Sequence, residues 1–268
     1  MRTPLTADER LDRVRENILA FRGPRLPANN PAIRRGVISI CGYGPSLNET
    51  WGSTFGALMT TSGAHDFMLG KGVVPDWHVE TDPRVHKGWM ITPHPDVKYL
   101  LNSQCHPSLF EKLAGYQVTM WHGFTDDDIE RQIALVEGLE PGTRLLGGGT
   151  NVGMRAIPVA REMGYQHFEL HGMDCCYRGN QHWAGGHFGQ RHPTVLIEVE
   201  GRRFETSEMM LQSTDDFFNI MRMMPNCRFR VHGEGLLEER LKLFNRDPVK
   251  ATSDNWWRPV NFERLEAA

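Results

Sequence analysis

Apolar and polar positions along the chain predict one helix followed by alternating strands and helices. Apolar residues recur at three- and four-residue steps over residues 11–21, after a Thr6–Glu9 pair with the spacing of a capping box. This segment is predicted to be an amphipathic helix of about four turns. Prolines then interrupt residues 22–35, which we expect to form an irregular linker.

From residue 36 onward, short apolar runs that suit buried strands alternate with helical patterns. Alternation of this kind indicates βαβ units and a mostly parallel sheet flanked by helices. We therefore predict an α/β fold with an N-terminal helix. The expected strands cover residues 36–41, 58–61, 77–81, 97–101, 117–121, 144–146, 167–171 and 228–232, and the expected helices cover 64–71, 107–114, 126–139, 151–163 and 207–224.

A polar loop over residues 174–193 interrupts this rhythm. Two short strands, 194–199 and 202–206, follow around a Glu200-Gly201 turn, and the end of the chain shows little pattern. The N-terminal helix is expected to pack on the main domain or on a partner subunit of a homo-oligomer. We divide the chain into an N-terminal helix and linker (1–35), a main domain (36–245) and a C-terminal tail (246–268).

Composition limits the class of protein. The 268 residues are 40% hydrophobic and 24% charged, which is ordinary for a globular protein. The net charge of −3 gives no basic field that would attract nucleic acid or an anionic membrane, so neither is expected as a partner. Five cysteines without a regular framework indicate a reduced, cytoplasmic protein. No apolar run reaches the ~20 residues of a membrane span, and the first residues lack the pattern of a signal peptide.

The first candidate site is a glycine-rich turn after the strand over residues 36–41. Gly42, Gly44, Pro45 and Ser46 form it. A Gly-x-Gly turn brings backbone N–H groups close to a ligand, where they can bind a phosphate, and Ser46 adds a hydroxyl donor or caps the next segment. Pro45 and the lack of a third glycine depart from the Rossmann fingerprint, and the absence of Gly-Lys-Ser/Thr excludes a P-loop. A purely structural turn is the alternative.

A second glycine-rich turn lies between the strand over 144–146 and the next helix. Gly148, Gly149, Thr150 and Asn151 belong to it, and consecutive glycines cost backbone entropy that a simple connection does not need. Thr150 or Asn151 either caps the helix or contacts a ligand. Because open α/β sheets bind ligands at the carboxyl ends of their strands, the two turns together predict a ligand crevice between them.

Two aspartates follow other predicted strands at the same edge of the sheet. Asp82 follows the strand over 77–81, and Asp174 follows the strand over 167–171. Carboxylates at these positions can bind the hydroxyl of a sugar or a base, or hold Mg²⁺ on a polyphosphate. For each aspartate alone, the capping of a loop is the alternative role.

The polar loop over residues 180–192 carries three histidines, His182, His187 and His192. Histidine is the usual general base near neutral pH, so His187 or His192 is a candidate for proton removal. A zinc site would need a neighbouring cysteine as well, and no Cys-x-x-Cys or His-Glu-x-x-His motif supports one. The glycines of this loop favour a mobile lid over a site, and a surface loop with incidental histidines is the alternative.

Three blocks of sequence carry a resemblance to a known family. They are Gly42-Tyr43-Gly44-Pro45-Ser46-Leu47, then Lys71-Gly72-Val73-Val74-Pro75-Asp76 followed by Glu80-Thr81-Asp82-Pro83, and finally Gly148-Gly149-Thr150-Asn151 with Leu170-His171-Gly172-Met173-Asp174. Their order and spacing, over roughly residues 36–240, resemble the 6-hydroxymethylpterin diphosphokinase-like family, which includes the motility-accessory-factor glycosyltransferases. A similar arrangement occurs in bacterial sialyltransferases, in which a histidine after the third block serves as the base. That resemblance makes His187 or His192 its counterpart here.

The resemblance implies a Rossmann-like α/β fold that binds a nucleotide, either ATP or a nucleotide-sugar, together with a hydroxyl acceptor. Archaeal relatives transfer diphosphate from ATP to a hydroxymethyl pterin, and other relatives transfer an acidic sugar from a CMP-sugar to a protein hydroxyl. Because the chain lacks the extra domains expected of the flagellin-modifying members, the leading hypothesis is a nucleotide-dependent transferase of the diphosphokinase type. A glycosyltransferase and a non-catalytic nucleotide-binding module are the alternatives.

On this hypothesis the candidate residues take three roles. Asp82 and Asp174 hold Mg²⁺ or substrate hydroxyls, and Asp174 joins His187 or His192 in proton transfer at the acceptor. Binding of the nucleotide phosphates is assigned to Gly42, Gly44, Pro45, Ser46, Gly148, Gly149, Thr150 and Asn151.

Overall fold

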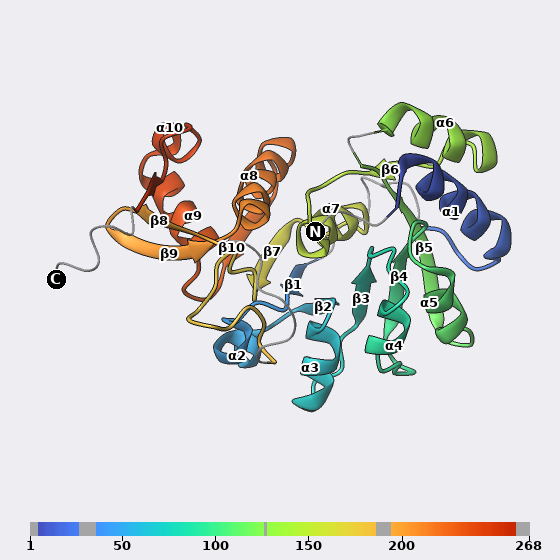
Figure 1. Cartoon of the computed structure of the whole chain (residues 1–268). Coiled ribbons are helices and arrows are strands. Elements are labelled where there is room, and N and C mark those ends of the chain that lie inside the picture. Colours follow the sequence, from blue (N-terminus) through green and yellow to red (C-terminus); the bar gives the residue numbers. More distant parts are fainter. Residues whose placement is uncertain (1–4, 27–35, 126–127, 186–193, 261–268) are drawn as a thin grey trace.

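In the part of the chain that the structure describes, eight strands form one parallel sheet (Figure 1). The computed structural model describes residues 5–26, 36–125, 128–185 and 194–260. The strands lie in the order β10-β7-β1-β2-β3-β4-β5-β6, and every neighbouring pair runs parallel. Their bounds are β1 Val37–Cys41, β2 Ala57–Thr61, β3 Trp77–Glu80, β4 Lys98–Asn102, β5 Gln117–Gly123, β6 Leu145–Leu146, β7 His167–His171 and β10 Arg228–Val231. The predicted α/β, Rossmann-like fold is confirmed.

Helices flank both faces of this sheet, with α7 and α8 on one face and α2, α3 and α5 on the other. No helix in the described ranges is long and apolar enough to cross a membrane. The helices are α1 Ala7–Ala20, α2 Leu47–Thr50, α3 Ala64–Gly70, α4 Lys87–Met90, α5 Pro107–Lys112, α6 Ile129–Leu139, α7 Val152–Glu162, α8 Glu208–Met223, α9 Leu236–Arg246 and α10 Pro248–Ala251, with a 3₁₀ turn η1 at Trp51–Ser53.

The side chains of the central strands are buried on both faces of the sheet. Ile38 and Ile40 of β1 pack with Phe168 of β7 in the core beneath α7 and α8, whereas Cys41 packs with Leu47 of α2 on the opposite face. A strand that is covered on both faces is apolar at most positions. In β1 the exception is Ser39, which is buried with its hydroxyl donating to the Phe55 carbonyl at 2.9 Å.

The order of the strands reverses between β1 and β7. From β1 the chain adds β2 to β6 one after another on one side, and it then returns to place β7 on the other side of β1, with β10 beyond it. Cys41 at the end of β1 lies opposite His171 at the end of β7. The two segments that leave this point therefore separate to opposite sides, which opens the edge of the sheet to a ligand.

The N-terminal helix α1 packs on the main sheet of its own chain. Val14 and Ile18 meet Met120 of β5 and Val136 of α6 in one small core. The predicted capping box is present, since the Thr6 side chain accepts from the Glu9 N–H while the Glu9 carboxylate accepts from the Thr6 N–H. Of the two predicted positions for this helix, the structure has the one on the main domain.

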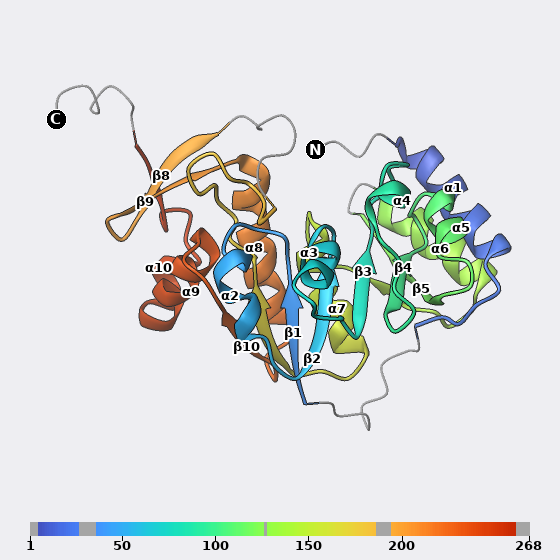
Figure 2. The ribbon, with the colours of Figure 1, turned by 90° about the horizontal axis from the view of Figure 1, so that it is seen from below.

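A second, antiparallel sheet lies at the opposite end of the molecule from α1 and α6 (Figure 2). Its strands are β8 Val195–Val199, β9 Arg202–Thr206 and β11 Arg258–Pro259, and the predicted Glu200-Gly201 turn joins the first two. The last segment, expected to have little pattern, thus forms α10 and β11. Helix α9, whose leucines repeat at helical spacing, was not predicted and packs beneath this sheet.

Candidate active site

A cavity of about 190 Å³ lies where the strand order reverses, at the carboxyl ends of β1, β2 and β7. The start of α7, the loop after β7 and the start of α8 complete its wall. The lining residues are Gly42, Tyr43, Gly44, Pro45, Thr61, Ser62, Asn151, Val152, Gly153, Met154, Gly172, Met173, Asp174, Cys175, Cys176, His182, Trp183, Met209, Met210 and Ser213. A crevice is therefore present at the predicted edge of the sheet. Of the candidate site residues, it is lined by Gly42, Gly44, Pro45, Asn151 and Asp174.

The turn after β1 packs backbone to backbone against the turn after β7. The N–H of Gly42 donates to the carbonyl of His171 and the N–H of Gly44 donates to the carbonyl of Gly172, both at 2.8 Å. A β-carbon on Gly44 would lie 2.2 Å from a carboxylate oxygen of Asp174. Glycine is thus needed here for close packing of the two turns. The sequence had led us to expect that these N–H groups bind a phosphate. In the structure both donate to carbonyls of the chain instead.

Asp174 is fixed in the cavity wall by Ser46. The Ser46 N–H lies 3.2 Å from each carboxylate oxygen, and its hydroxyl donates to Oδ2 at 3.0 Å. Burial raises the pKa of Asp174, although the two groups of Ser46 favour the ionised form and partly oppose this shift. A carboxyl group with a raised pKa beside a cavity is suited to proton transfer. Ser46 is itself buried behind the wall, where it orients Asp174.

The second glycine-rich turn is bound mainly to α8. Gly148 and Gly149 have φ angles of +139° and +89°, which glycine adopts most readily. The N–H and hydroxyl of Thr150 donate to Asp216 at 2.8 and 3.0 Å. Gly148, Gly149 and Thr150 are not among the residues that line the cavity. Their observed contacts position the start of α7.

Asn151 is the member of this turn that reaches the cavity. Its side-chain oxygen caps α7 by accepting from the N–H of Met154 at 3.0 Å, and its amide donates to Ser213 at 2.8 Å. Val152 and Gly153, the first residues of α7, also line the cavity. Because the first N–H groups of a helix have no partner within it, this end of the cavity carries a partial positive charge.

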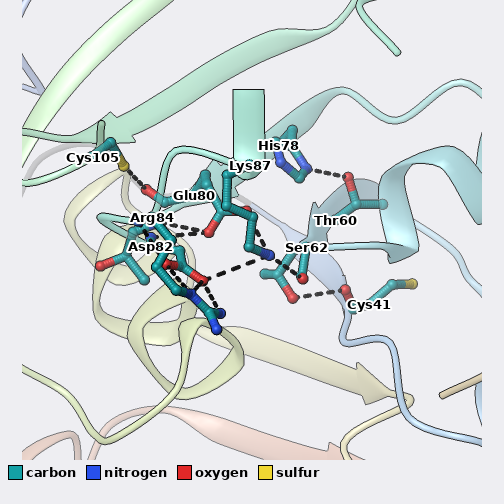
Figure 3. A network of polar contacts seen from close by, with 11 residues as sticks. Cys41, Thr60, Ser62, His78, Glu80, Asp82, Arg84, Lys87 and Cys105 are labelled. Carbon is teal, nitrogen blue, oxygen red and sulfur yellow. Dashed lines mark hydrogen bonds and ion pairs between the residues drawn. The ribbon is translucent and has the colours of Figure 1, made fainter. Parts of the chain in front are cut away.

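Asp82 lies outside the cavity lining, after β3 (Figure 3). Its two carboxylate oxygens accept from Nε of Arg84 at 2.8 and 2.9 Å, and Nζ of Lys87 lies 4.0 Å away. Burial alone would raise the pKa of Asp82, but the hydrogen bonds from Arg84 and the charge of Lys87 outweigh burial and lower it. Asp82 is therefore an ion-paired carboxylate.

The structure does not bring Asp82 and Asp174 together. They follow β3 and β7, which are separated in the sheet by β2 and β1. Each carboxylate already accepts hydrogen bonds from its own neighbours, Arg84 and Ser46 respectively. Among the described residues, no three histidine, cysteine, aspartate or glutamate side chains are grouped so that they could hold a metal ion. The side chains therefore do not fit a magnesium ion shared by the two aspartates.

His187 and His192 lie outside the described residues, but His182 of the same loop lines the cavity. Its ring stacks on Trp183, with centroids 4.7 Å apart, and Tyr177 lies 5.0 Å away on another side. The next residue, Ala184, is anchored over the first turn, because its N–H donates to the Tyr43 carbonyl at 3.0 Å. The start of the histidine loop thus lies at the cavity, and the role of the loop as a mobile lid stays a prediction.

Several cavity residues were not singled out from the sequence. Trp183 of the histidine loop is one, and Met209 and Met210 at the start of α8 are two others. Ser62 directly follows β2, so its place at the ligand edge of a parallel sheet was a usable signal. Another cavity of about 190 Å³, lined by Arg25, His122, Arg144 and Glu162 among others, lies near the amino end of β6, away from the strand reversal.

Comparison with solved structures shows that this fold has precedents. The MAf glycosyltransferase from Magnetospirillum magneticum AMB-1 has a similar fold, with a TM-score of 0.60 and 15% identity over 97% of this chain and 43% of that chain. The chain thus spans less than half the length of that enzyme.

Two sialyltransferases are more distant. CstII from Campylobacter jejuni, solved with cytidine-5′-monophosphate, has a TM-score of 0.41 at 12% identity over 86% of this chain and 92% of its own. A mammalian sialyltransferase, solved with Gal-beta-1-3GalNAc-ortho-nitrophenol, has a TM-score of 0.44 at 12% identity over 87% of this chain and 82% of its own.

No curated protein matches the chain. A sequence model of one family does, and its match spans residues 27–180, from the linker before β1 to the loop after β7. This stretch contains the turns after β1 and β7 and the start of α7, which form much of the cavity wall. Because the match covers more than half of the chain, the protein belongs to the 6-hydroxymethylpterin diphosphokinase MptE-like family.

Proposed function

We propose that the protein is a nucleotide-dependent transferase that moves a diphosphate group from ATP to a hydroxyl acceptor. The observation that carries this proposal is the cavity at the reversal between β1 and β7, because its wall joins the first and third sequence blocks of the family. Ligands of open α/β sheets bind at such a point. The name of the family supplies the acceptor class, a hydroxymethyl group on a pterin ring.

The reaction is an in-line displacement at phosphorus. The acceptor oxygen forms a bond to the β-phosphorus of ATP, the bond from that phosphorus to the oxygen bridging to the α-phosphate breaks, and AMP leaves with the electron pair. The acceptor loses its proton to a base. Asp174, with its raised pKa and its place in the wall, is one candidate base. His182 lines the same cavity, and His187 and His192 remain candidates by sequence.

The residues that line the cavity suit both parts of a nucleotide. Ser62 and the start of α7 offer hydroxyl and N–H donors to phosphate oxygens. An apolar part of the lining suits a flat ring, either a nucleobase or a pterin. It consists of Met173, Trp183, Met209 and Met210. Gly42, Gly44 and Pro45 line the cavity, but proline has no N–H and the N–H groups of the two glycines are already bonded, so these residues would contact the nucleotide without donating to its phosphates.

A glycosyltransferase that uses a CMP-sugar is the second candidate. In that reaction the acceptor oxygen bonds to the anomeric carbon of the sugar, and CMP leaves with the electrons of the broken carbon–oxygen bond. One observation favours it: among the described residues, no lysine or arginine lines the cavity. A single phosphate needs less compensating charge than a triphosphate does.

Release of the leaving group separates these candidates. The protein is incubated with ATP and 6-hydroxymethylpterin, and separately with CMP-sialic acid and a hydroxyl acceptor. Acceptor-dependent release of AMP with a diphosphorylated pterin supports the proposal, whereas release of CMP supports the second candidate. Nucleotide binding without either release leaves a non-catalytic binding module. Asp174→Asn should abolish the observed release, while Asp96→Asn, at an exposed aspartate, should not.

A further inference from the structure

Lys87, the first residue of α4, points its ammonium group toward Ser62, Glu80 and Asp82 (Figure 3), and of these Ser62 lines the cavity. We propose that Lys87 is the resident cation for the donor phosphates, held where a divalent metal ion would otherwise stand. This inference rests on the proposed nucleotide-dependent function and adds to it the source of positive charge. It also explains why Glu80 and Asp82, two carboxylates at the carboxyl end of β3, pair with a lysine rather than with a metal ion.

Three oxygens from separate residues surround the ammonium group. Nζ of Lys87 donates to Oγ of Ser62 at 2.8 Å, and it lies 3.4 Å from a carboxylate oxygen of Glu80 and 4.0 Å from one of Asp82. The Lys87 side chain is only 10% exposed. A charge so far removed from water must be compensated by nearby groups. Two carboxylates and a hydroxyl are also a donor set that a hard divalent cation accepts, and here the ammonium fills it.

The two carboxylates near Lys87 also have other hydrogen-bond partners. Asp82 is already engaged by Arg84 through both of its oxygens, and its contact with Lys87 is the longest of the three. One oxygen of Glu80 accepts from the N–H groups of Thr81 and Asp82 at 2.9 and 3.1 Å. These carboxylates therefore keep partners of their own if a phosphate oxygen approaches Lys87.

Ser62 connects this group to the cavity. It lines the cavity and has a φ of +50°, a conformation in which glycine would be less strained. A serine at a strained position beside a ligand cavity points to a use for its hydroxyl. That hydroxyl accepts from Lys87, so its own proton is free to point toward a phosphate oxygen. Lys87 and Ser62 thus form a pair at the rim.

The experiment measures affinities for AMP, ADP and ATP by calorimetry, with excess chelator and then with Mg²⁺. The wild-type protein should bind ATP more tightly than AMP even in chelator. Lys87→Gln should lower the ratio of ATP affinity to AMP affinity by at least about tenfold, the scale of one lost charge-assisted contact. The affinity for AMP itself should change little. Lys71→Gln, a lysine that stacks on Trp51 and Phe67 away from the cavity, is the matched control.

Two further variants guard against a folding defect in Lys87→Gln. Ser62→Gly suits the local backbone and removes the hydroxyl, so it should fold and lose part of the same gain. Lys87→Ala leaves three oxygens facing the vacated space, and Mn²⁺ should restore its ATP affinity without affecting the wild type. Folding of each variant is checked by thermal unfolding.

The outcomes separate this inference from the function on which it rests. If the wild-type protein binds none of the three nucleotides, the nucleotide-dependent function fails, and the role of Lys87 fails with it. If the wild type binds ATP but chelator abolishes that binding, or if Lys87→Gln and Ser62→Gly keep the full gain from AMP to ATP, only the role of Lys87 is overturned.

Discussion

Ser46 and Asp174, 128 positions apart in the sequence, are joined by the Ser46 N–H and by its hydroxyl, which lies 3.0 Å from Oδ2 of Asp174. This contact crosses the point at which the strand order reverses. It fixes the one carboxylate among the residues that line the cavity. The geometry of the site therefore depends on how closely the turns after β1 and β7 approach one another.

The first prediction tests that approach. Gly44→Ala places a methyl group 2.2 Å from Oδ2 of Asp174 in the present geometry, so the two turns must separate. We expect the free energy of unfolding to fall by about 1–3 kcal/mol, as for other overpacked sites, and nucleotide affinity to fall with it. Urea denaturation and calorimetry measure the two effects. Gly52→Ala, where a β-carbon has nothing within 4 Å, is the control, and equal behaviour of the two variants would contradict the prediction.

The second prediction concerns the pH dependence of turnover. Burial raises the pKa of Asp174, and the hydrogen bonds from Ser46 oppose that rise. Ser46→Ala removes one of these bonds to the ionised form, so the pKa of Asp174 should rise further. If Asp174 is the base, the acidic limb of kcat/KM against pH moves to higher pH. Ser53→Ala, on the exposed η1 turn, should leave the limb in place, and an unmoved limb in Ser46→Ala would assign the proton transfer to another group.

The third prediction concerns stability at acid pH. Burial, followed by the charge of His232, lowers the pKa of His171 to about 4, and the two rings stack with centroids 4.2 Å apart. The unfolded chain binds the proton near pH 6.5, so this part of the stability is present above pH 6.5 and is lost as the pH falls toward 4.

By pH 5 the loss from His171 should reach about 2 kcal/mol. Urea denaturation of His171→Gln at pH 5 and pH 7.5 should therefore show a smaller drop in the free energy of unfolding than the wild type shows. His94→Gln, at a partly exposed histidine, serves as the control. An identical drop in His171→Gln and the wild type would mean that other groups cause the acid sensitivity.

The fourth prediction tests whether the end of the chain is part of the folded domain. Arg240 lies between the rings of Phe218 and Trp256, at 4.6 and 4.0 Å, and donates to the carbonyl of Ala251 at 3.1 Å. Lysine cannot reproduce this flat, forked contact.

Arg240→Lys should therefore lower the free energy of unfolding by about 2 kcal/mol or more, as for other buried charged groups that lose partners. Arg246→Lys, on the exposed side of α9, is the control. A change in Arg240→Lys no larger than in this control would show that the segment after α9 contributes little to stability.

The sequence was sufficient for the parallel sheet but not for the contacts of its ligand edge. The apolar run of Val37–Cys41 and the glycines after it identify β1 and its turn, because burial on both faces leaves a direct mark on the sequence. Helix α9 carries leucines at helical spacing, so it too could have been predicted from the sequence. The contact of Ser62 with Lys87 joins the residue after β2 to the first residue of α4, and only the packed structure specifies it.

The same limit explains the assignments for the acidic groups. Asp82 was a candidate metal ligand because it follows a predicted strand, yet its partner Arg84 lies only two residues away. Two residues so near in the sequence can form an ion pair, but whether they do depends on how the loop after β3 turns. The sequence therefore could not predict the Asp82–Arg84 pair. Asp174 shows the converse case, since its position after β7 identified a true cavity residue.

The last prediction separates an enzyme from a binding module through the histidine loop. A positioned base contributes roughly 10²–10⁴-fold to the rate of proton removal, and a binding module gains nothing from one. His182→Ala, His187→Ala and His192→Ala are compared, and we expect one of them to lower kcat by at least about tenfold. Nucleotide affinity should change little in His187→Ala and His192→Ala, since phosphate binding is assigned to other elements.

The split between kcat and affinity distinguishes a base from a binding residue among the three. His182 stacks on Trp183 in the wall, so its loss should also weaken binding if that wall holds the nucleobase. His167→Ala, at the exposed start of β7 and on the opposite edge of the sheet, is the control for a general effect of removing a histidine. If all three loop variants keep full turnover, proton removal belongs to Asp174 instead. If the wild type binds nucleotide yet releases neither AMP nor CMP, the protein is a binding module, and the loop serves only to cover its ligand.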